Sequence, residues 1–236
     1  MTGSLSCPDP KSCPVPSIPR GPSRFATTVL NAGSPVWRVY RLQYGYDSFN
    51  PGIGDTRFAP LITKSGPVPT LYGGYDEVSA LLESVLHDVH HSAGERVIYE
   101  AVLRDLGLAR VRVPADMQLV DLRNSALADR GLSRQQIVTT TAEHYPCTRQ
   151  WAVWLHRTRH SGILCDGIVW HSRQSELHQA DTLREVFMLF GDRVPSDPGS
   201  YPLSGPGVRN LTEGPGRLLL ERLAEELEAR IEPAND

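Results

Sequence analysis

The stretch PTLYGGYDEVSALLESVLHDV, residues 69–89, joins a short apolar run, a pair of glycines and an amphipathic helix pattern. Asp76 stands where its carboxylate can accept hydrogen bonds from the free N–H groups of a first helical turn. Apolar residues then recur at intervals of three and four, which is the mark of one buried helix face: Val78, Leu81, Leu82, Val85, Leu86 and Val89. The sequence therefore predicts a core helix that Asp76 caps and that reaches Val89.

Glu83 lies inside this apolar pattern, between Leu82 and Ser84. A carboxylate at the edge of an apolar face costs free energy unless something uses its charge. The common alternative is a solvated glutamate at the edge of a helix. Glu83 is therefore a candidate functional residue only if other parts of the chain supply partners.

Length and composition describe an ordinary globular protein. The chain has 236 residues, of which 40% are hydrophobic and 22% charged, enough for one good-sized domain with appendages or two small ones. A net charge of −3 gives no basic field that could hold nucleic acid. No run of about 20 apolar residues could span a membrane, and the N-terminus lacks the layout of a secretory signal. We therefore expect a cytoplasmic protein that binds neither membranes nor nucleic acid directly.

Short strands and few helices predict a single compact α+β domain over residues 30–195. Residues 1–25 are rich in Pro and Ser and are expected to form a disordered tail. Residues 196–216 have the composition of a linker, and residues 217–231 that of an amphipathic helix, which would fold back on the domain or meet a partner. Strands are expected at residues 36–42, 97–103, 109–113, 119–122, 167–171 and 185–190, and helices at 124–131 and 145–157.

The four cysteines give no zinc-binding spacing. Cys7 and Cys13 lie in the tail and could pair or remain free, whereas Cys147 and Cys165 fall in folded segments, where reduced, buried thiols are usual. Because no CxxC pair occurs, we predict no structural zinc site.

Histidines offer a weaker metal signal. His87, His90 and His91 have helical spacing that could place two of them on one face, but no motif supplies a further ligand. A polar helix end, where the dipole favours a cation, is the simpler interpretation. His171 is expected to point away from Ser172 along its strand. No metal ligands are predicted.

Three further polar residues lie at positions that the composition of the surrounding segments does not explain. Arg38 lies within a predicted strand, whose alternation places Arg38 and Tyr40 on one face and Trp37 and Val39 on the other. Arg57 lies in a long loop, within GDTRFAP, and Ser172 follows the apolar strand that contains GIVWH. Each has an ordinary alternative: an edge-strand surface residue, a loop tie to a carboxylate and a strand-end hydroxyl.

Together with Glu83 these residues suit a dinucleotide. Arginine forks can give two parallel bonds to phosphate oxygens, and a carboxylate can stabilise positive charge at an anomeric carbon. Tyr72 and Phe58 can stack on a flat ring. The set fits cleavage of a dinucleotide at a ribose–base bond. No GxGxxG or P-loop frame is present, so a Rossmann or ATP site is not indicated.

The order WRVY, FNPGIGDTRFAP, PTLYGGYDEVSALLESVLHDV and DGIVWHS resembles the RES domain, roughly from Pro35 to Arg193. That family is named for an Arg, a Glu and a Ser, which match Arg38, Glu83 and Ser172 as catalytic residues. Further pocket positions, expected to bind substrate, match Arg57, Tyr72, Tyr40 and Phe58.

The resemblance implies a fold similar to ADP-ribosyltransferases and diphtheria-type toxins, and degradation of NAD⁺ by hydrolysis or phosphorolysis. NAD⁺ would be a substrate, with inorganic phosphate as a co-substrate in phosphorolysis, and no bound cofactor is implied. By analogy Arg38 and Arg57 would hold the phosphates and Tyr72 would stack near the nicotinamide. Glu83 would stabilise the ribosyl cation, and Ser172 would bind the ribose or the nucleophile.

The same resemblance implies the toxin of a RES–Xre toxin–antitoxin pair, blocked by a helical Xre-type antitoxin. Two alternatives remain. One is an ADP-ribosyltransferase that modifies a protein with the same residues, and the other is a non-catalytic module that keeps the pocket for a nucleotide or binds a partner through the C-terminal helix. A homo-oligomer is left open by the sequence.

Overall fold

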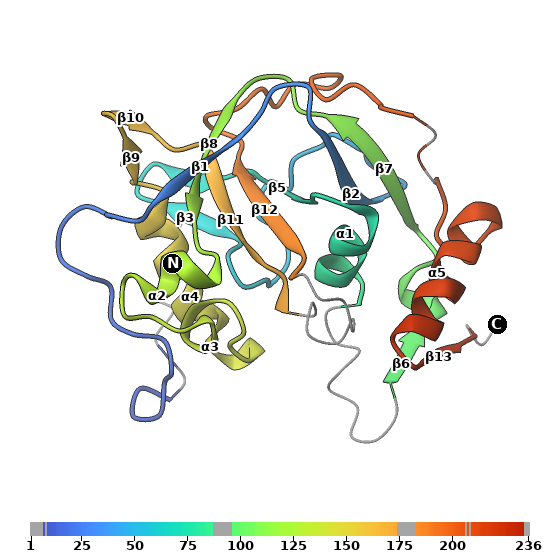
Figure 1. Ribbon diagram of the computed structural model, residues 1–236, viewed down its shortest axis with the longest axis horizontal. Coiled ribbons are helices and arrows are strands. Elements are labelled where there is room, and N and C mark those ends of the chain that lie inside the picture. The colour runs from blue at the N-terminus through green and yellow to red at the C-terminus, as the bar shows by residue number, and fades with distance from the viewer. Residues whose placement is uncertain are drawn as a thin grey trace.

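A seven-stranded sheet of order β1-β8-β11-β12-β5-β2-β7 runs through the computed structural model, which describes residues 7, 9–86, 96–173, 183–205, 207 and 209–233 (Figure 1). Neighbouring strands are antiparallel except β8 and β11, which are parallel, so the sheet is mixed and the fold is α+β. The strands are β1 (Thr27–Leu30), β2 (Pro35–Arg41), β5 (Thr70–Gly74), β7 (Leu106–Arg112), β8 (Met117–Asp121), β11 (Gly167–His171) and β12 (Glu185–Phe190).

Small strand pairs and short helices surround this sheet. The pairs are β3 (Leu61–Thr63) with β4 (Gly66–Val68), β6 (Arg96–Tyr99) with β13 (Ala229–Glu232), and β9 (Arg159–His160) with β10 (Ile163–Leu164). The helices are α1 (Glu77–Ser84), α2 (Asn124–Ala128), α3 (Arg134–Ile137), α4 (Tyr145–Leu155) and α5 (Gly214–Glu226), with single 3₁₀ turns η1 (Glu100–Val102) and η2 (Ala142–His144). In Figure 1, α2, α3 and α4 gather at one end of the sheet, α5 lies beyond the other end, and α1 lies between them. Within the described ranges, no helix combines the length and apolar character needed to cross a membrane.

Helix α1 begins as the sequence predicts. The Asp76 carboxylate accepts a hydrogen bond of 2.7 Å from the Ser79 N–H, and Leu81 and Leu82 are fully buried. The helix ends at Ser84, earlier than the pattern indicates, although Leu86 beyond it is still buried. Val89, His87, His90 and His91 lie outside the described residues.

The two faces of β2 pack against different partners, as its alternation predicts. Trp37 and Val39 pack with the buried residues of α1 and α5. Val36 and Tyr40 belong to the opposite face, where they pack with Tyr201 from the segment after β12. Helix α1 therefore lies on the face that Arg38 does not share.

The C-terminal prediction needs correction. The helix ends at Glu226, not at residue 231. Glu228 has a φ of 51°, which ends the helical path of the chain. Ala229–Glu232 then form β13, which pairs with β6 in parallel. Residues 196–216 are not a free linker either, because Tyr201 and Leu211 are buried and α5 begins at Gly214. Pairing with β6 supplies the backbone hydrogen bonds that a longer helix would have supplied.

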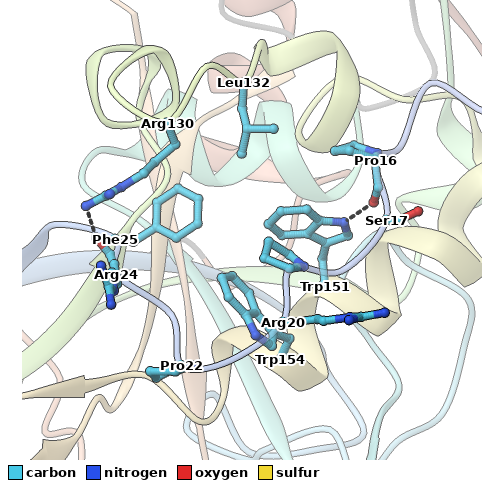
Figure 2. Close-up of a pocket in the computed structure, with 11 residues that line it drawn as sticks. Pro16, Ser17, Arg20, Pro22, Arg24, Phe25, Arg130, Leu132, Trp151 and Trp154 are labelled. Carbon is cyan, nitrogen blue, oxygen red and sulfur yellow. Dashed lines mark hydrogen bonds between the residues drawn. The ribbon is translucent and has the colours of Figure 1, made fainter.

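The described part of the N-terminal segment packs on α4 instead of forming a disordered tail. Val15 and Phe25 are buried in the same core cluster as Trp151 and Trp154. The Trp151 indole N–H donates to the Pro16 carbonyl at 2.7 Å (Figure 2). The Trp154 indole N–H donates to the Gly21 carbonyl at 3.0 Å. Composition alone misses these anchors, because both tryptophans lie far along the chain.

Gly74 gives a test of how closely α1 packs on the sheet. A Cβ atom there would lie 2.5 Å from the Ala80 amide nitrogen and 2.8 Å from Ser79 Cβ. We expect Gly74→Ala to destabilise the fold by about 1–3 kcal/mol, the range for overpacking, measured by urea denaturation. Gly207→Ala is the matched control, because its nearest neighbours lie 3.4 Å away. Equal unfolding midpoints for the two variants would contradict the close packing.

Candidate functional site

The carboxylate of Glu83 is held by two donors from the end of one strand. The Ser172 hydroxyl donates to Glu83 Oε2 at 2.7 Å, and the Trp170 indole N–H donates to Oε1 at 3.3 Å. Trp170 and Ser172 are two residues apart at the end of β11, so both side chains face α1. Ser172 and Trp170 are buried, whereas Glu83 is half-buried. Two donors fix the orientation of this carboxylate.

Aromatic rings surround the Trp170 indole. Phe58 and Tyr72 both meet it edge-on, with ring centroids 5.1 Å and 6.0 Å away. The Tyr72 hydroxyl lies 3.0 Å from the Thr56 hydroxyl. Burial raises the pKa of Tyr72 above its ordinary value and the charge of Glu83 raises it further, although the bond to Thr56 opposes both. Tyr72 is therefore a neutral hydrogen-bonding group at physiological pH.

Arg57 reaches the same region from the loop before β3. Its Nη1 donates to the Thr140 carbonyl at 2.8 Å and to the Thr140 hydroxyl at 2.7 Å, and its guanidinium lies 5.0 Å from the centre of the Tyr145 ring. Only 7% of Arg57 is exposed. Burial lowers the pKa of Arg57, Tyr145 and Glu83 oppose that shift, and Arg173 adds to it. Glu83 and Arg57 are thus close enough to influence each other's charge.

Arg38 and Tyr40 lie elsewhere. Arg38 donates to the Tyr46 carbonyl at 2.8 Å and to the Ser48 carbonyl. Burial lowers the pKa of Arg38 to about 10, and Asp47 and Tyr201 oppose the shift. Tyr40 packs edge-on against Tyr46 at 6.4 Å. Both side chains point away from α1 because of strand alternation, so the structure does not bring them to Glu83.

Five of the seven predicted site residues therefore come together: Glu83, Ser172, Arg57, Tyr72 and Phe58. In this structure Arg38 instead holds the start of the loop that leads to Arg57. A role for Arg38 or Tyr40 in contact with substrate stays a prediction.

Several members of this group are absent from the sequence prediction. Trp170 could have been found, because its position two residues before Ser172 puts both on one strand face. Arg134 donates to the Ser172 carbonyl at 3.2 Å, and Thr140 and Tyr145 contact Arg57. These three residues come from the segment that runs from α3 to the start of α4, which carries no recognisable sequence motif. Only the folded structure shows that they lie beside Ser172 and Arg57.

His171 belongs to a separate polar group on the other face. The Asn124 N–H donates to His171 Nδ1 at 3.3 Å, and Nε2 lies 3.9 Å from the Glu185 carboxylate. Arg123 pairs with Asp121 and with Glu185. Burial lowers the pKa of His171, Glu185 opposes that shift, and the nearby arginines strengthen it. This ion-pair group tethers β8 to β12, on the face of β11 opposite to Trp170 and Ser172.

A cavity of about 330 Å³ lies between the N-terminal segment and α4 (Figure 2). Its lining includes Pro16, Arg20, Phe25, Trp151 and Trp154, and none of the predicted site residues. The Glu83 group is therefore distinct from this cavity, and we centre the candidate site on the carboxylate and its donors.

Comparison with curated proteins found no match. A family model, described as the RES domain, matches residues 35–203. That range holds 169 of the 236 residues and includes every predicted site residue, from Arg38 to Ser172. The chain therefore belongs to the RES domain family.

Proposed function

We propose that this protein degrades NAD⁺ by cleaving the bond between nicotinamide and ribose, with water or phosphate as the acceptor. The observation that carries the proposal is the Glu83 carboxylate, oriented by Ser172 and Trp170 and near the buried cation Arg57. Membership of the RES domain family supports an NAD-related reaction. We further propose that the α+β fold is related to that of the ADP-ribosyltransferases.

Glu83 would act on the ribosyl group. As the C1″–nitrogen bond to nicotinamide breaks, its electron pair leaves with nicotinamide, which departs neutral, and positive charge grows on the ribose. A fixed carboxylate stabilises that charge without reorganising. The nucleophile then forms a bond to C1″ and releases its proton to solvent. Ser172, whose hydroxyl donates to Glu83 in the free protein, would turn that bond toward a ribose hydroxyl or the nucleophile.

Arg57 and Tyr72 would position the rest of the dinucleotide. Arg57 offers a permanent positive charge for the diphosphate, with its fork already oriented by Thr140 and Tyr145. Tyr72 and Phe58 would provide an aromatic surface beside the nicotinamide. For Arg38 the structure favours an indirect role, because both of its contacts hold loop carbonyls at Tyr46 and Ser48.

The proposed biological role is that of a toxin restrained by a partner. A helical Xre-type antitoxin would block access to the Glu83 group. Co-purification of the two chains should suppress loss of NAD⁺, and release of the antitoxin should restore it.

Product analysis separates the proposed reactions. Purified protein is incubated with NAD⁺, with and without phosphate, and the products are identified by mass. ADP-ribose without phosphate identifies a glycohydrolase, and ADP-ribose-1″-phosphate formed only with phosphate identifies a phosphorylase. Intact NAD⁺ in both reactions contradicts this function and favours protein ADP-ribosylation or a nucleotide-binding module.

Glu83→Gln tests the carboxylate directly. Glutamine keeps the size and one acceptor oxygen, but it removes the negative charge. We expect kcat for NAD⁺ loss to fall by about 100–1000-fold, the effect of losing one transition-state contact, with little change in Tm. Glu77→Gln, at the start of the same helix and paired with Arg222, is the matched control and should retain activity. A fully active Glu83→Gln variant would overturn the assignment.

The variants Arg57→Lys and Arg38→Lys test which of the two arginines contacts the substrate and which supports the loop. Lysine keeps the charge but loses the fork. Loss of a charged contact is worth about 1.5–3 kcal/mol, so we expect Arg57→Lys to raise KM for NAD⁺ by about 10–100-fold. Arg38→Lys should mainly lower Tm, because it loses a loop carbonyl contact. An equal rise in KM for Arg38→Lys, with Tm unchanged, would assign Arg38 to the substrate.

A further inference from the structure

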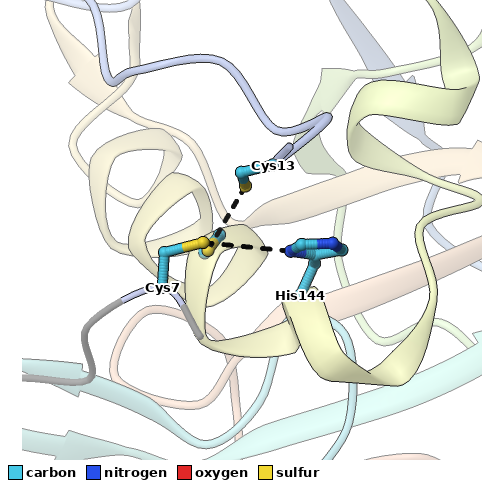
Figure 3. Close-up of side chains that lie close together, drawn as sticks. Cys7, Cys13 and His144 are labelled. Carbon is cyan, nitrogen blue, oxygen red and sulfur yellow. Dashed lines mark hydrogen bonds between the residues drawn. The ribbon is translucent and has the colours of Figure 1, made fainter. Parts of the chain in front are cut away.

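Four side chains that can bind a metal, from two distant segments, converge beside the start of α4. Figure 3 shows three of them, Cys7, Cys13 and His144. Cys7 and Cys13 come from the N-terminal segment, His144 ends η2, and Cys147 lies in the first turn of α4. One ligand atom from each residue lies within 4.8 Å of the others. The Cys13 and Cys147 sulfurs are 3.8 Å apart, and Cys7 Sγ is 4.0 Å from His144 Nδ1.

These separations suit tetrahedral coordination better than a disulfide. With zinc–sulfur bonds of about 2.3 Å, two sulfurs at tetrahedral positions lie about 3.8 Å apart. A disulfide requires about 2.05 Å between sulfurs, and all four cysteines are free thiols in this structure. A single disulfide would also leave a third thiol and an imidazole in the same cluster.

His144 is oriented as a metal ligand would be. Its Nδ1 faces the sulfur of Cys7, while its Nε2 lies 3.7 Å from the Glu143 carboxylate. Histidines that bind zinc commonly use the second ring nitrogen to contact a carboxylate. His144 and Cys147 are both buried, and Cys7 and Cys13 are half-buried, so the four groups meet at a sheltered position.

We propose that Cys7, Cys13, His144 and Cys147 form a structural zinc site that fastens the N-terminal segment to α4. Three thiolates and one imidazole complete a closed tetrahedron, which leaves no position for a substrate. Binding of Zn²⁺ displaces the three thiol protons to solvent, with no change in oxidation state. The metal would take no chemical part in the proposed reaction with NAD⁺.

Such a site explains how a proline-rich segment with few apolar residues can keep a fixed position. The contacts of the segment with α4 include the buried side chains of Val15 and Phe25 and the carbonyls that accept from Trp151 and Trp154. Zinc would add a cross-link ahead of these contacts and restrict the unfolded chain, since Cys13 and Cys147 are 134 residues apart.

The test is the metal content of the full chain, purified without a metal-binding tag and measured by mass spectrometry of the elements. We expect about one zinc per chain. Replacement by Co²⁺ should produce the visible bands and the thiolate charge-transfer absorption of a tetrahedral sulfur site. Cys7→Ser, Cys13→Ser and His144→Ala should each reduce the zinc content severalfold and lower Tm.

Cys165→Ala is the matched control, because Cys165 is buried in the core and its sulfur lies outside the cluster. It should retain a full equivalent of zinc. Cys7→Ser keeps the test decisive if other variants unfold, since Cys7 is only half-buried. Folded, metal-free protein in which Cys7, Cys13 and Cys147 are all reduced thiols would overturn the proposal. A mass two units lower, from a disulfide among these cysteines, would overturn it as well.

Discussion

The hydrogen bond from Ser172 to Glu83 joins the end of β11 to the last turn of α1, and the candidate site is arranged around it. A half-buried carboxylate at this position loses hydration, which the Ser172 hydroxyl and the Trp170 N–H partly replace. The close packing of α1 against Gly74 fixes the position of Glu83 relative to β11. The helix cannot move away from the sheet without losing the packing of Leu81 and Leu82.

Charge balance on this face depends on residues from several segments. Burial of the Arg57 guanidinium costs free energy, which the Thr140 acceptors, the Tyr145 ring and the negative charge of Glu83 offset. Glu83 and Arg57 influence each other's charge, and together they present one negative and one positive group to a ligand of mixed charge. A cationic ribose and an anionic diphosphate provide such a mixture, and that complementarity is the physical basis of the NAD⁺ proposal.

Local patterns predicted much of this arrangement, whereas contacts between distant segments were beyond them. The cap at Asp76, the strand at Trp170 and the alternation of β2 all depend on near neighbours in the sequence. The position of Arg38 relative to Glu83 depends on which face of the sheet receives α1, and no local pattern states that. The strand β13 also depends on a contact between distant segments. Its apolar residues continue the helical period, but pairing with β6 outweighs helix propensity. The cysteine cluster was missed because spacing motifs assume that ligands come in sequence-local pairs.

The first turn of α4 links the two proposals physically. Tyr145, which lies against the guanidinium of Arg57, directly follows His144. The Thr148 hydroxyl, which donates to the Arg57 carbonyl at 2.6 Å, directly follows Cys147. A metal held by His144 and Cys147 would therefore restrict the same turn that positions Arg57. The two sites remain chemically separate, because zinc would contact no substrate atom, but the stiffness of one supports the geometry of the other. In this view the N-terminal segment would help to hold Arg57 in position, at a distance from the carboxylate that we propose acts on the ribose.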